Sequence, residues 1–250
     1  MADDELYDTI GRGYSQTRQP DERIKAAIEQ ALSNSAGVLN VGAGAGSYEP
    51  LGRTAAAVEL SQTMIRQRPS DAAPVIQGSA LHLPFSDESF GASLAILTLH
   101  HWPDYRLGLR EMKRVAQERV VVLTWDPYGP DFWLTRDYFP EILEIDREIF
   151  PGMDDYADVL GRIEIRNVEV PCDCTDGFLG AYWRRPHAYL EKHVRDAMST
   201  FTKLSDVETG VKALAHDLND GTWKDRNHDI LDRESIDLGY RLVIADLTSR

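Results

Sequence analysis

The stretch Val38-Leu-Asn-Val-Gly-Ala-Gly-Ala-Gly-Ser47 runs from a short apolar segment into a turn that contains three glycines. Glycine permits tight turns and lets the backbone come close to a bound molecule. Ligands of open α/β sheets bind at the carboxyl ends of the strands, where such a turn lies. Glu59 ends the next apolar run, 19 residues after Asn40, and a carboxylate at about this distance accepts hydrogen bonds from both ribose hydroxyls of an adenosine. The stretch therefore predicts a strand, a turn and an adenosine site.

The glycine pattern differs from that of a dinucleotide site. Ser47 stands where the fingerprint G-x-G-x-x-G has its third glycine. Residues 48–54 are interrupted by Pro50 and Gly52 and predict at most a stub of helix. A short helix offers a weak dipole to a pyrophosphate. The pattern favours an adenosine ligand without phosphates over NAD.

The first half of the chain alternates between helical and strand-like patterns. Residues 22–33 carry an apolar helical face, and residues 104–118 carry a second one that Asp104 can cap. Continuous apolar runs, typical of parallel strands covered on both faces, lie at 37–41, 55–58, 74–76, 92–97 and 120–123. Strand, helix and strand in this order predict βαβ units and an α/β sheet.

The second half is organised differently. Residues 131–160 are rich in aromatic side chains, 163–170 predict a strand that ends at Pro171, and 240–247 predict a closing strand. The long segments between these strands predict lids, because loops of this length are usually functional. We expect one domain over residues 1–250. Its core is expected at 34–126, 160–171 and 238–250, and its lids at 1–25, 127–159 and 172–237.

Composition and charge exclude several classes of protein. Of the 250 residues 42% are hydrophobic and 27% charged, which is typical of globular chains. Lys and Arg total 27 against 41 Asp and Glu, and this net charge of −14 disfavours nucleic acid as a partner. No apolar run is long enough to span a membrane, and the acidic start lacks the features of a signal peptide. Cys172 and Cys174, the only cysteines, fit neither a disulfide framework nor a zinc site. A soluble, cytoplasmic protein is expected.

Four stretches together resemble a known family. They are Val38–Ser47, Ala57-Val-Glu-Leu-Ser61, Gly78-Ser-Ala-Leu-His-Leu-Pro-Phe85 with Asp87–Phe90, and Leu99-His-His-Trp-Pro-Asp104. In order and spacing they resemble class I methyltransferases of the type 11 (ubiquinone/menaquinone-type) group, which depend on S-adenosyl-L-methionine (SAM) and release S-adenosyl-L-homocysteine (SAH). Beyond residue 125 the likeness is to uncharacterised bacterial members. The resemblance implies a Rossmann-like α/β sheet, mostly parallel with the last strand antiparallel, and helical lid insertions.

The resemblance also implies a set of SAM-binding residues. Glu59 holds the ribose, Ser79 and Ala80 lie beside the adenine, and Arg18 reaches the carboxylate. The implied set is Tyr14, Arg18, Gly42, Ala43, Gly44, Glu59, Leu60, Met64, Ser79, Ala80, Leu97 and Thr98. The family usually has Asp where Asn40 and Ser79 stand, and each lost interaction costs on the order of 1 kcal/mol.

The reacting end of the site has three candidate residues. Methyl transfer from a sulfonium requires that the acceptor be held in line with the breaking S–CH₃ bond and shielded from water. A base is needed only where the acceptor must lose a proton. His100 and His101 follow the fourth strand, where the resemblance puts the methyl group, and histidine titrates near neutral pH. We expect His101, and then His100, as the base, with Tyr14 at the methyl end.

Aromatic and basic side chains predict the acceptor pocket, since such walls suit a planar or hydrophobic molecule. The candidates are Trp102, Trp125, Trp133, Tyr182, Trp183 and Arg184. Each could instead be part of an ordinary lid core or a solvated charge. Asp126, Asp173 and Asp176 could hold an amine or cap helices. No metal site is predicted, because the histidines are scattered or adjacent.

Three functions are compatible with these residues. The first is methyl transfer to an N, O or C atom of a small molecule, by a monomer or homodimer with no nucleic-acid or membrane partner. The second is a catalytically weak or inactive SAM-binding partner protein, which the changes at Asn40 and Ser79 keep open. The third is an NAD-dependent oxidoreductase, which the displaced third glycine disfavours.

Overall fold

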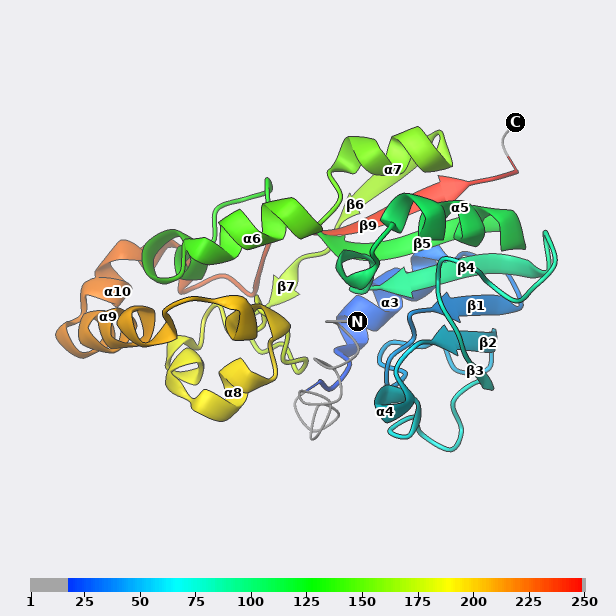
Figure 1. Cartoon of the computed structure of the whole chain (residues 1–250). Helices are drawn as coiled ribbons and strands as arrows, with labels where there is room; N and C mark the ends of the chain where they lie inside the picture. The colour runs from blue at the N-terminus through cyan, green and yellow to red at the C-terminus, as the bar shows by residue number, and fades with distance from the viewer. Residues whose placement is uncertain (1–17, 249–250) are drawn as a thin grey trace.

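The computed structural model describes residues 18–248, and its centre is one seven-stranded sheet. The strand order is β3-β2-β1-β4-β5-β9-β6 (Figure 1). The strands are β1 (Val38–Val41), β2 (Thr54–Glu59), β3 (Val75–Gln77), β4 (Phe90–Ile96), β5 (Ala116–Trp125), β6 (Ile163–Asn167) and β9 (Tyr240–Asp246). Strands β1 to β5 pair in parallel, and β9 pairs antiparallel with β5 and with β6. The predicted mostly parallel sheet with an antiparallel last strand is confirmed.

Helices cover both faces of the sheet. Helix α5 (Tyr105–Val115) packs on one face, and α3 (Glu22–Ala31) packs on the other against β5 and β9. Asp104 accepts a hydrogen bond from the backbone N–H of Leu107 and so caps α5 as predicted. The helix ends earlier than the predicted residue 118, because β5 begins directly at Ala116 with no loop between them.

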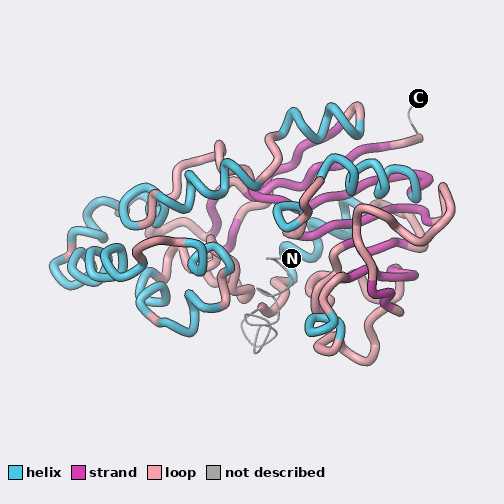
Figure 2. The backbone as a smooth tube through the Cα atoms, in the orientation of Figure 1, coloured by secondary structure: helices cyan, strands magenta, loops and turns pink. Residues whose placement is uncertain are grey.

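A helical lobe lies beyond the end of the sheet at which β4 ends, and Figures 1 and 2 show its helices gathered there. We call it the lid lobe. Its elements are η2 (Leu134–Tyr138), α6 (Glu141–Ile149), η3 (Pro186–Leu190), α8 (Lys192–Asp196), η4 (Ser199–Lys203), α9 (Val207–Asp220), α10 (Thr222–Arg226) and η5 (His228–Ile230). The short strands β7 (Val170–Pro171) and β8 (Ser235–Ile236) pair at its base.

The expected first lid, residues 127–159, is divided in the structure. Helix α7 (Met153–Leu160) packs against α5 and β6, and its Tyr156 and Leu160 share a buried cluster with Leu109 and Met112 of α5. Tyr156 also donates a hydrogen bond to Thr124 of β5 at 3.0 Å. Apolar burial therefore assigns α7 to the layer that covers the sheet, and the lid ends with α6.

Aromatic rings form the interior of the lid lobe. Trp133 lies edge-on to Tyr138, Tyr189 and Trp223, with ring centroids 5.2–6.0 Å apart. Its indole N–H donates to the carbonyl of Trp183, whose own indole N–H donates to the carbonyl of Val170. The indole N–H groups of Trp133 and Trp183 thus have acceptors inside the lobe, whereas the buried Nε1 of Trp223 has none among residues 18–248.

No helix among residues 18–248 is both long enough and apolar enough to cross a membrane.

Candidate functional site

Two adjoining cavities open at the carboxyl ends of β1, β2 and β4. The larger encloses about 1060 Å³ including its mouth, and the smaller about 650 Å³. Arg18, Leu97 and His101 line both cavities. A molecule in one cavity therefore meets a molecule in the other beside these three residues.

The glycine turn after β1 forms the floor of the larger cavity. Gly42 and Gly44 have φ values of +68° and +53°, a conformation that side chains rarely adopt. A Cβ at Gly42 would lie 2.4 Å from the hydroxyl oxygen of Thr98, and a Cβ at Gly44 would lie 3.4 Å from the methyl of Met64. The turn can lie this close to its neighbours only because it has no side chains there.

Glu59 stands at the end of β2 and is tied to the turn. One carboxylate oxygen accepts a hydrogen bond from the backbone N–H of Gly44 and the other from that of Ser61, both at 2.8 Å. A carboxylate has about four lone-pair directions. Glu59 therefore keeps acceptor capacity on the cavity side while its orientation is held by the backbone.

Asn40 takes part in a buried polar group behind the turn. Its amide N–H donates to Glu49 at 3.0 Å, and Glu49 pairs with Arg68 at 2.8 Å. An Asp at position 40 would put two buried carboxylates against each other, so the amide suits this neighbourhood. The Oδ1 of Asn40 is buried and has no hydrogen-bond partner among residues 18–248, although Asn40 lines the larger cavity.

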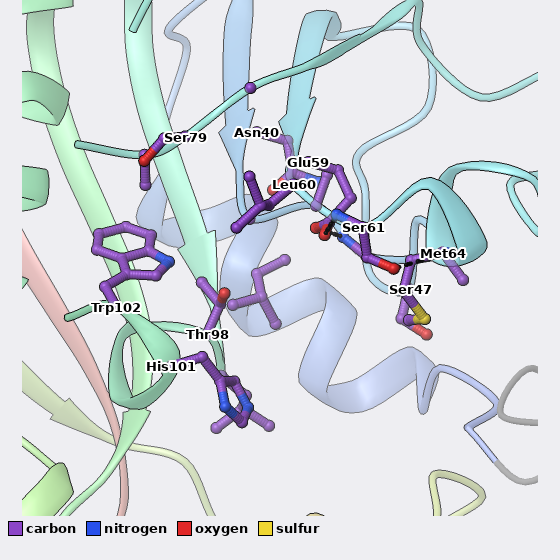
Figure 3. Close-up of a pocket in the computed structure, with 18 of the residues that line it drawn as sticks. Asn40, Ser47, Glu59, Leu60, Ser61, Met64, Ser79, Thr98, His101 and Trp102 are labelled. Atoms are coloured by element: carbon purple, nitrogen blue, oxygen red, sulfur yellow. Dashed lines mark hydrogen bonds between the residues drawn. The ribbon is translucent and has the colours of Figure 1, made fainter. Parts of the chain in front are cut away.

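The other walls of the larger cavity are mainly apolar. Figure 3 shows Ser79 and Trp102 at one end of it and Ser47 and Met64 at the other. Leu60 lines this cavity and is 51% exposed. Ser79 accepts a hydrogen bond from the backbone N–H of Leu81 through its hydroxyl.

The chain is strained where the two cavities meet. Leu97 follows β4 with a φ of +48°, which costs a non-glycine residue about 1–2 kcal/mol. Such strain persists only where the surrounding structure holds it, and it is frequent at functional sites. The turn at Leu97 leads into η1 (Leu99–His101), which brings His101 to the wall shared by both cavities.

The smaller cavity has aromatic walls. His100 stacks on Phe150 with ring centroids 4.2 Å apart, and Trp125 meets Phe150 edge-on at 5.7 Å. Phe178 and Tyr240 pack together at 4.6 Å on its lining. The indole N–H of Trp125 is already used, since it donates to the carbonyl of Leu238 at 2.7 Å. The rings therefore present apolar faces that suit a flat molecule.

Both histidines are held neutral, which differs from the expected titration near neutral pH. Burial lowers the pKa of His101 to about 3, with a further contribution from the positive charge of Lys203. Burial also lowers the pKa of His100 far below its usual range. A histidine this hard to protonate is a weak base. In the structure as it stands, His101 is suited to hydrogen bonding and positioning.

Arg18 forms an ion pair that the sequence did not reveal. Its guanidinium donates to both carboxylate oxygens of the fully buried Asp176, at 2.6 and 3.3 Å. Its expected partner was the carboxylate of SAM. Tyr14, expected at the methyl end, lies outside the described residues.

The predicted acceptor residues are not gathered in one place. Trp125 lines the smaller cavity, and Trp102 lines the larger one. Trp133 and Trp183 line neither and are buried in the lid lobe, because their indole N–H groups are satisfied by backbone carbonyls there. Tyr182 borders a separate surface hollow, and the guanidinium of Arg184 donates to the carbonyls of Leu231 and Arg233. These last four residues therefore line neither of the two cavities.

Several lining residues of the smaller cavity were missed. They are Asp146, Phe150, Phe178, Leu179, Ala197, Met198, Ser199, Thr200 and Tyr240. The sequence held one indication of Asp146. It lies four residues after the buried Ile142 and therefore on the same face of the helix. A carboxylate at an apolar position of an amphipathic helix indicates a functional role.

One group outside the cavities could in principle ligate a metal. His216, Asp217 and Asp220 of α9 have ligand atoms within 4.8 Å of one another. Asp217 already pairs with Arg226 and accepts a hydrogen bond from Tyr138. The expectation of no metal remains a prediction.

Known proteins resemble this chain over its core and, in one case, over nearly its whole length. Residues 39–123 match a family model described as a methyltransferase domain. A demethylmenaquinone methyltransferase of Corynebacterium urealyticum is 32% identical over 125 residues, which are 45% of this chain and 54% of that protein. A 2-methyl-6-phytyl-1,4-hydroquinone methyltransferase of rice is 27% identical over 96 residues, which are 38% of this chain and 28% of that protein. The chain thus spans about a quarter to a half of these curated relatives.

A crystal structure from Anabaena variabilis, of a protein assigned as a methyltransferase from an antibiotic biosynthesis pathway, is 33% identical to this chain. It superposes with a TM-score of 0.85 over 93% of this chain and 100% of that one. A SAM-dependent methyltransferase from Thermotoga maritima shares the fold, with a TM-score of 0.57 and 14% identity over 97% of each chain.

Proposed function

This chain belongs to the family of SAM-dependent methyltransferases, and on that premise we propose that it binds SAM in the larger cavity and methylates a small molecule held in the smaller one. The observation that carries the proposal is the pair of cavities that share Arg18, Leu97 and His101. A two-substrate transfer needs two adjoining sites whose contents meet at one point.

The residues of the larger cavity fit SAM. The unpartnered Oδ1 of Asn40 can accept a hydrogen bond from the ammonium group of SAM. Asn40 can therefore still contact the cofactor, although it lacks the negative charge of an Asp. Glu59 has acceptor capacity for the ribose hydroxyls. The exposed Leu60, with Ser79, offers the adenine an apolar wall and a hydroxyl.

When bound, SAM supplies an electrophilic methyl group on a sulfonium. The chain has to hold the acceptor in line and exclude water. Leu97 and the neutral His101 lie where the two cavities join, so they orient the acceptor. Arg18 and Asp176 form a neutral pair that fixes the segment before α3 at the same junction. Arg18 therefore serves as a positioning residue.

Two observations support a small molecule over other acceptors. The surface is strongly acidic, with a net charge of −14, which disfavours nucleic acid. The smaller cavity lies between the sheet and the lid lobe and is lined by residues of both, which suits a compact ligand. The cytoplasmic location and the monomeric or homodimeric state remain predictions from the sequence.

The oxidoreductase alternative loses support from the turn. No α-helix follows the glycines among residues 47–61, so no helix N-terminus is available there for a pyrophosphate. An inactive SAM-binding partner protein would also bind SAM, so only a measurement of turnover distinguishes it from an active methyltransferase.

Calorimetry with SAM, SAH and NADH tests the proposal. We expect SAM and SAH to bind and NADH not to bind. Glu59→Gln should weaken SAM by about 1–3 kcal/mol, or about 5- to 150-fold, through lost charge-assisted hydrogen bonds. Glu208→Gln, at an exposed position of α9, is the matched control. Binding of NADH without SAM would refute the cofactor, and SAM binding without SAH formation over an acceptor panel would favour the inactive partner.

A further inference from the structure

A buried carboxyl, that of Asp146, belongs to the lining of the smaller cavity. Asp146 of α6 is 1% exposed and lines the cavity with His100, Trp125 and Phe150. Its Oδ1 has no hydrogen-bond partner among residues 18–248. A buried carboxyl without a partner destabilises a fold, so a chain that keeps one in a cavity has a use for it. Asp146 is suited to receive a hydrogen bond from a ligand.

The groups around Asp146 come from several elements. His100 and His101 face the cavity from η1, Arg18 from the segment before α3, and Tyr240 from β9. Lys203 acts on it electrostatically from η4. Arg18 is balanced by Asp176 and both histidines are neutral, so Asp146 decides the charge of the lining, and Lys203 acts on it from outside the lining.

This charge pattern distinguishes between kinds of hydrogen-bond donor. Burial raises the pKa of Asp146 to about 7, although Lys203 acts against this rise. Near neutral pH the carboxyl is therefore partly protonated. An ammonium ligand would bring a further positive charge toward Lys203 and would lose its hydration in the cavity. A hydroxyl carries no charge and can bond to the carboxyl in either protonation state.

The walls restrict the shape of the ligand. His100 and Phe150 stack face to face, and Trp125 and Phe178 stand on other sides of the same cavity. Flat apolar faces on several sides of one cavity suit a compact ring system.

We propose that Asp146 is the residue that determines acceptor specificity, by accepting a hydrogen bond from an uncharged hydroxyl on a compact, flat acceptor. The inference rests on the proposed function, since it names the kind of molecule that would be methylated there. A site built to bond a hydroxyl rejects the same molecule without it, because the buried polar group is then left unpaired.

The test uses three probes of one shape: 2-naphthol, 2-methylnaphthalene and 2-(aminomethyl)naphthalene, titrated by ligand-observed NMR into the full chain saturated with SAH. We expect 2-naphthol to bind about tenfold tighter than 2-methylnaphthalene, and tighter than the ammonium compound. In Asp146→Ala the preference for 2-naphthol should fall to within about twofold. Asp146→Asn should keep part of it, because its amide oxygen still accepts.

Two controls make the outcomes distinct. Glu148→Gln, at an exposed position of the same helix, should keep the full preference. SAH affinity is measured on the same samples, and its absence in the unmodified chain would contradict the proposed function. Normal SAH binding with an unchanged preference in Asp146→Ala would overturn the role of Asp146. Tighter binding of the ammonium compound would overturn the selection of a hydroxyl.

Discussion

Replacing Asp146 with Asn should change how the stability of the protein depends on pH. The carboxyl has a pKa of 3.8 as its ordinary value and about 7 in the fold, because burial disfavours its charged form. Below pH 3.8 both folded and unfolded chains hold the proton. As the pH rises toward 7 the unfolded chain releases it and the folded chain does not, so stability falls over this window and levels off above it.

The size of this effect follows from the two pKa values. Between pH 5 and pH 8 the linkage relation gives a loss of about 2–3 kcal/mol from this one carboxyl. Asn has the same shape and no charge, so Asp146→Asn lacks the loss. The stability advantage of the variant over the unmodified chain should therefore grow by about 2–3 kcal/mol over that range. This is equivalent to a difference of roughly 4–12 °C in melting temperature for a chain of this size.

Thermal unfolding at a series of pH values measures this difference directly. The two buried histidines also affect stability over this range, because they take up a proton only in the unfolded chain, but they are present in both proteins and cancel in the comparison. Glu148→Gln removes a carboxyl from an exposed position of the same helix, and its curve should run parallel to that of the unmodified chain. Parallel curves for Asp146→Asn as well would show that the carboxyl is not held neutral by burial, and the reasoning would be refuted.

Three further predictions concern the junction and the larger cavity. Asn40→Asp places a second carboxylate next to Glu49 and should lower the free energy of unfolding in urea by about 1–3 kcal/mol. Adding Glu49→Gln should recover most of this loss. An unchanged midpoint of urea unfolding for Asn40→Asp would contradict the prediction. Gly44→Ala and Gly37→Ala both put a side chain at positive φ, so each should lower the free energy of unfolding by about 1 kcal/mol. Only Gly44→Ala should weaken SAM binding, by at least about tenfold, because Gly37 lines neither cavity. Equal SAM affinities of the two variants in calorimetry would place the cofactor elsewhere. His101→Gln should lower turnover by one constant factor from pH 6 to 9, since the pKa of His101 is about 3; a titration near pH 6.5 that disappears in this variant would restore His101 as the base.

The centre of the sheet was predictable because β1, β4 and most of β5 are buried on both faces. The runs that became β1, β4 and β5 are nearly continuous apolar segments, and such runs keep their strand character in any α/β packing. The glycine turn was equally readable, since a left-handed backbone favours glycine, and Glu59 lies beside this turn as its spacing along the chain predicts. The boundaries were less certain, as the direct passage from α5 into β5 at Ala116 illustrates.

The acceptor side was decided by tertiary structure. Trp125 and Trp133 are the same residue type at neighbouring places in the chain, yet one lines the smaller cavity and the other fills the lid lobe. The pairing of Arg18 with Asp176 joins residues 158 positions apart, and no local pattern announces it. The low pKa of His101 and the raised pKa of Asp146 come from burial by segments distant in sequence. Local sequence determined the central strands, the glycine turn and the position of Glu59 beside it, because backbone conformation and spacing are local properties. Burial and charge pairing at the smaller cavity exist only once the lid lobe has packed over the sheet.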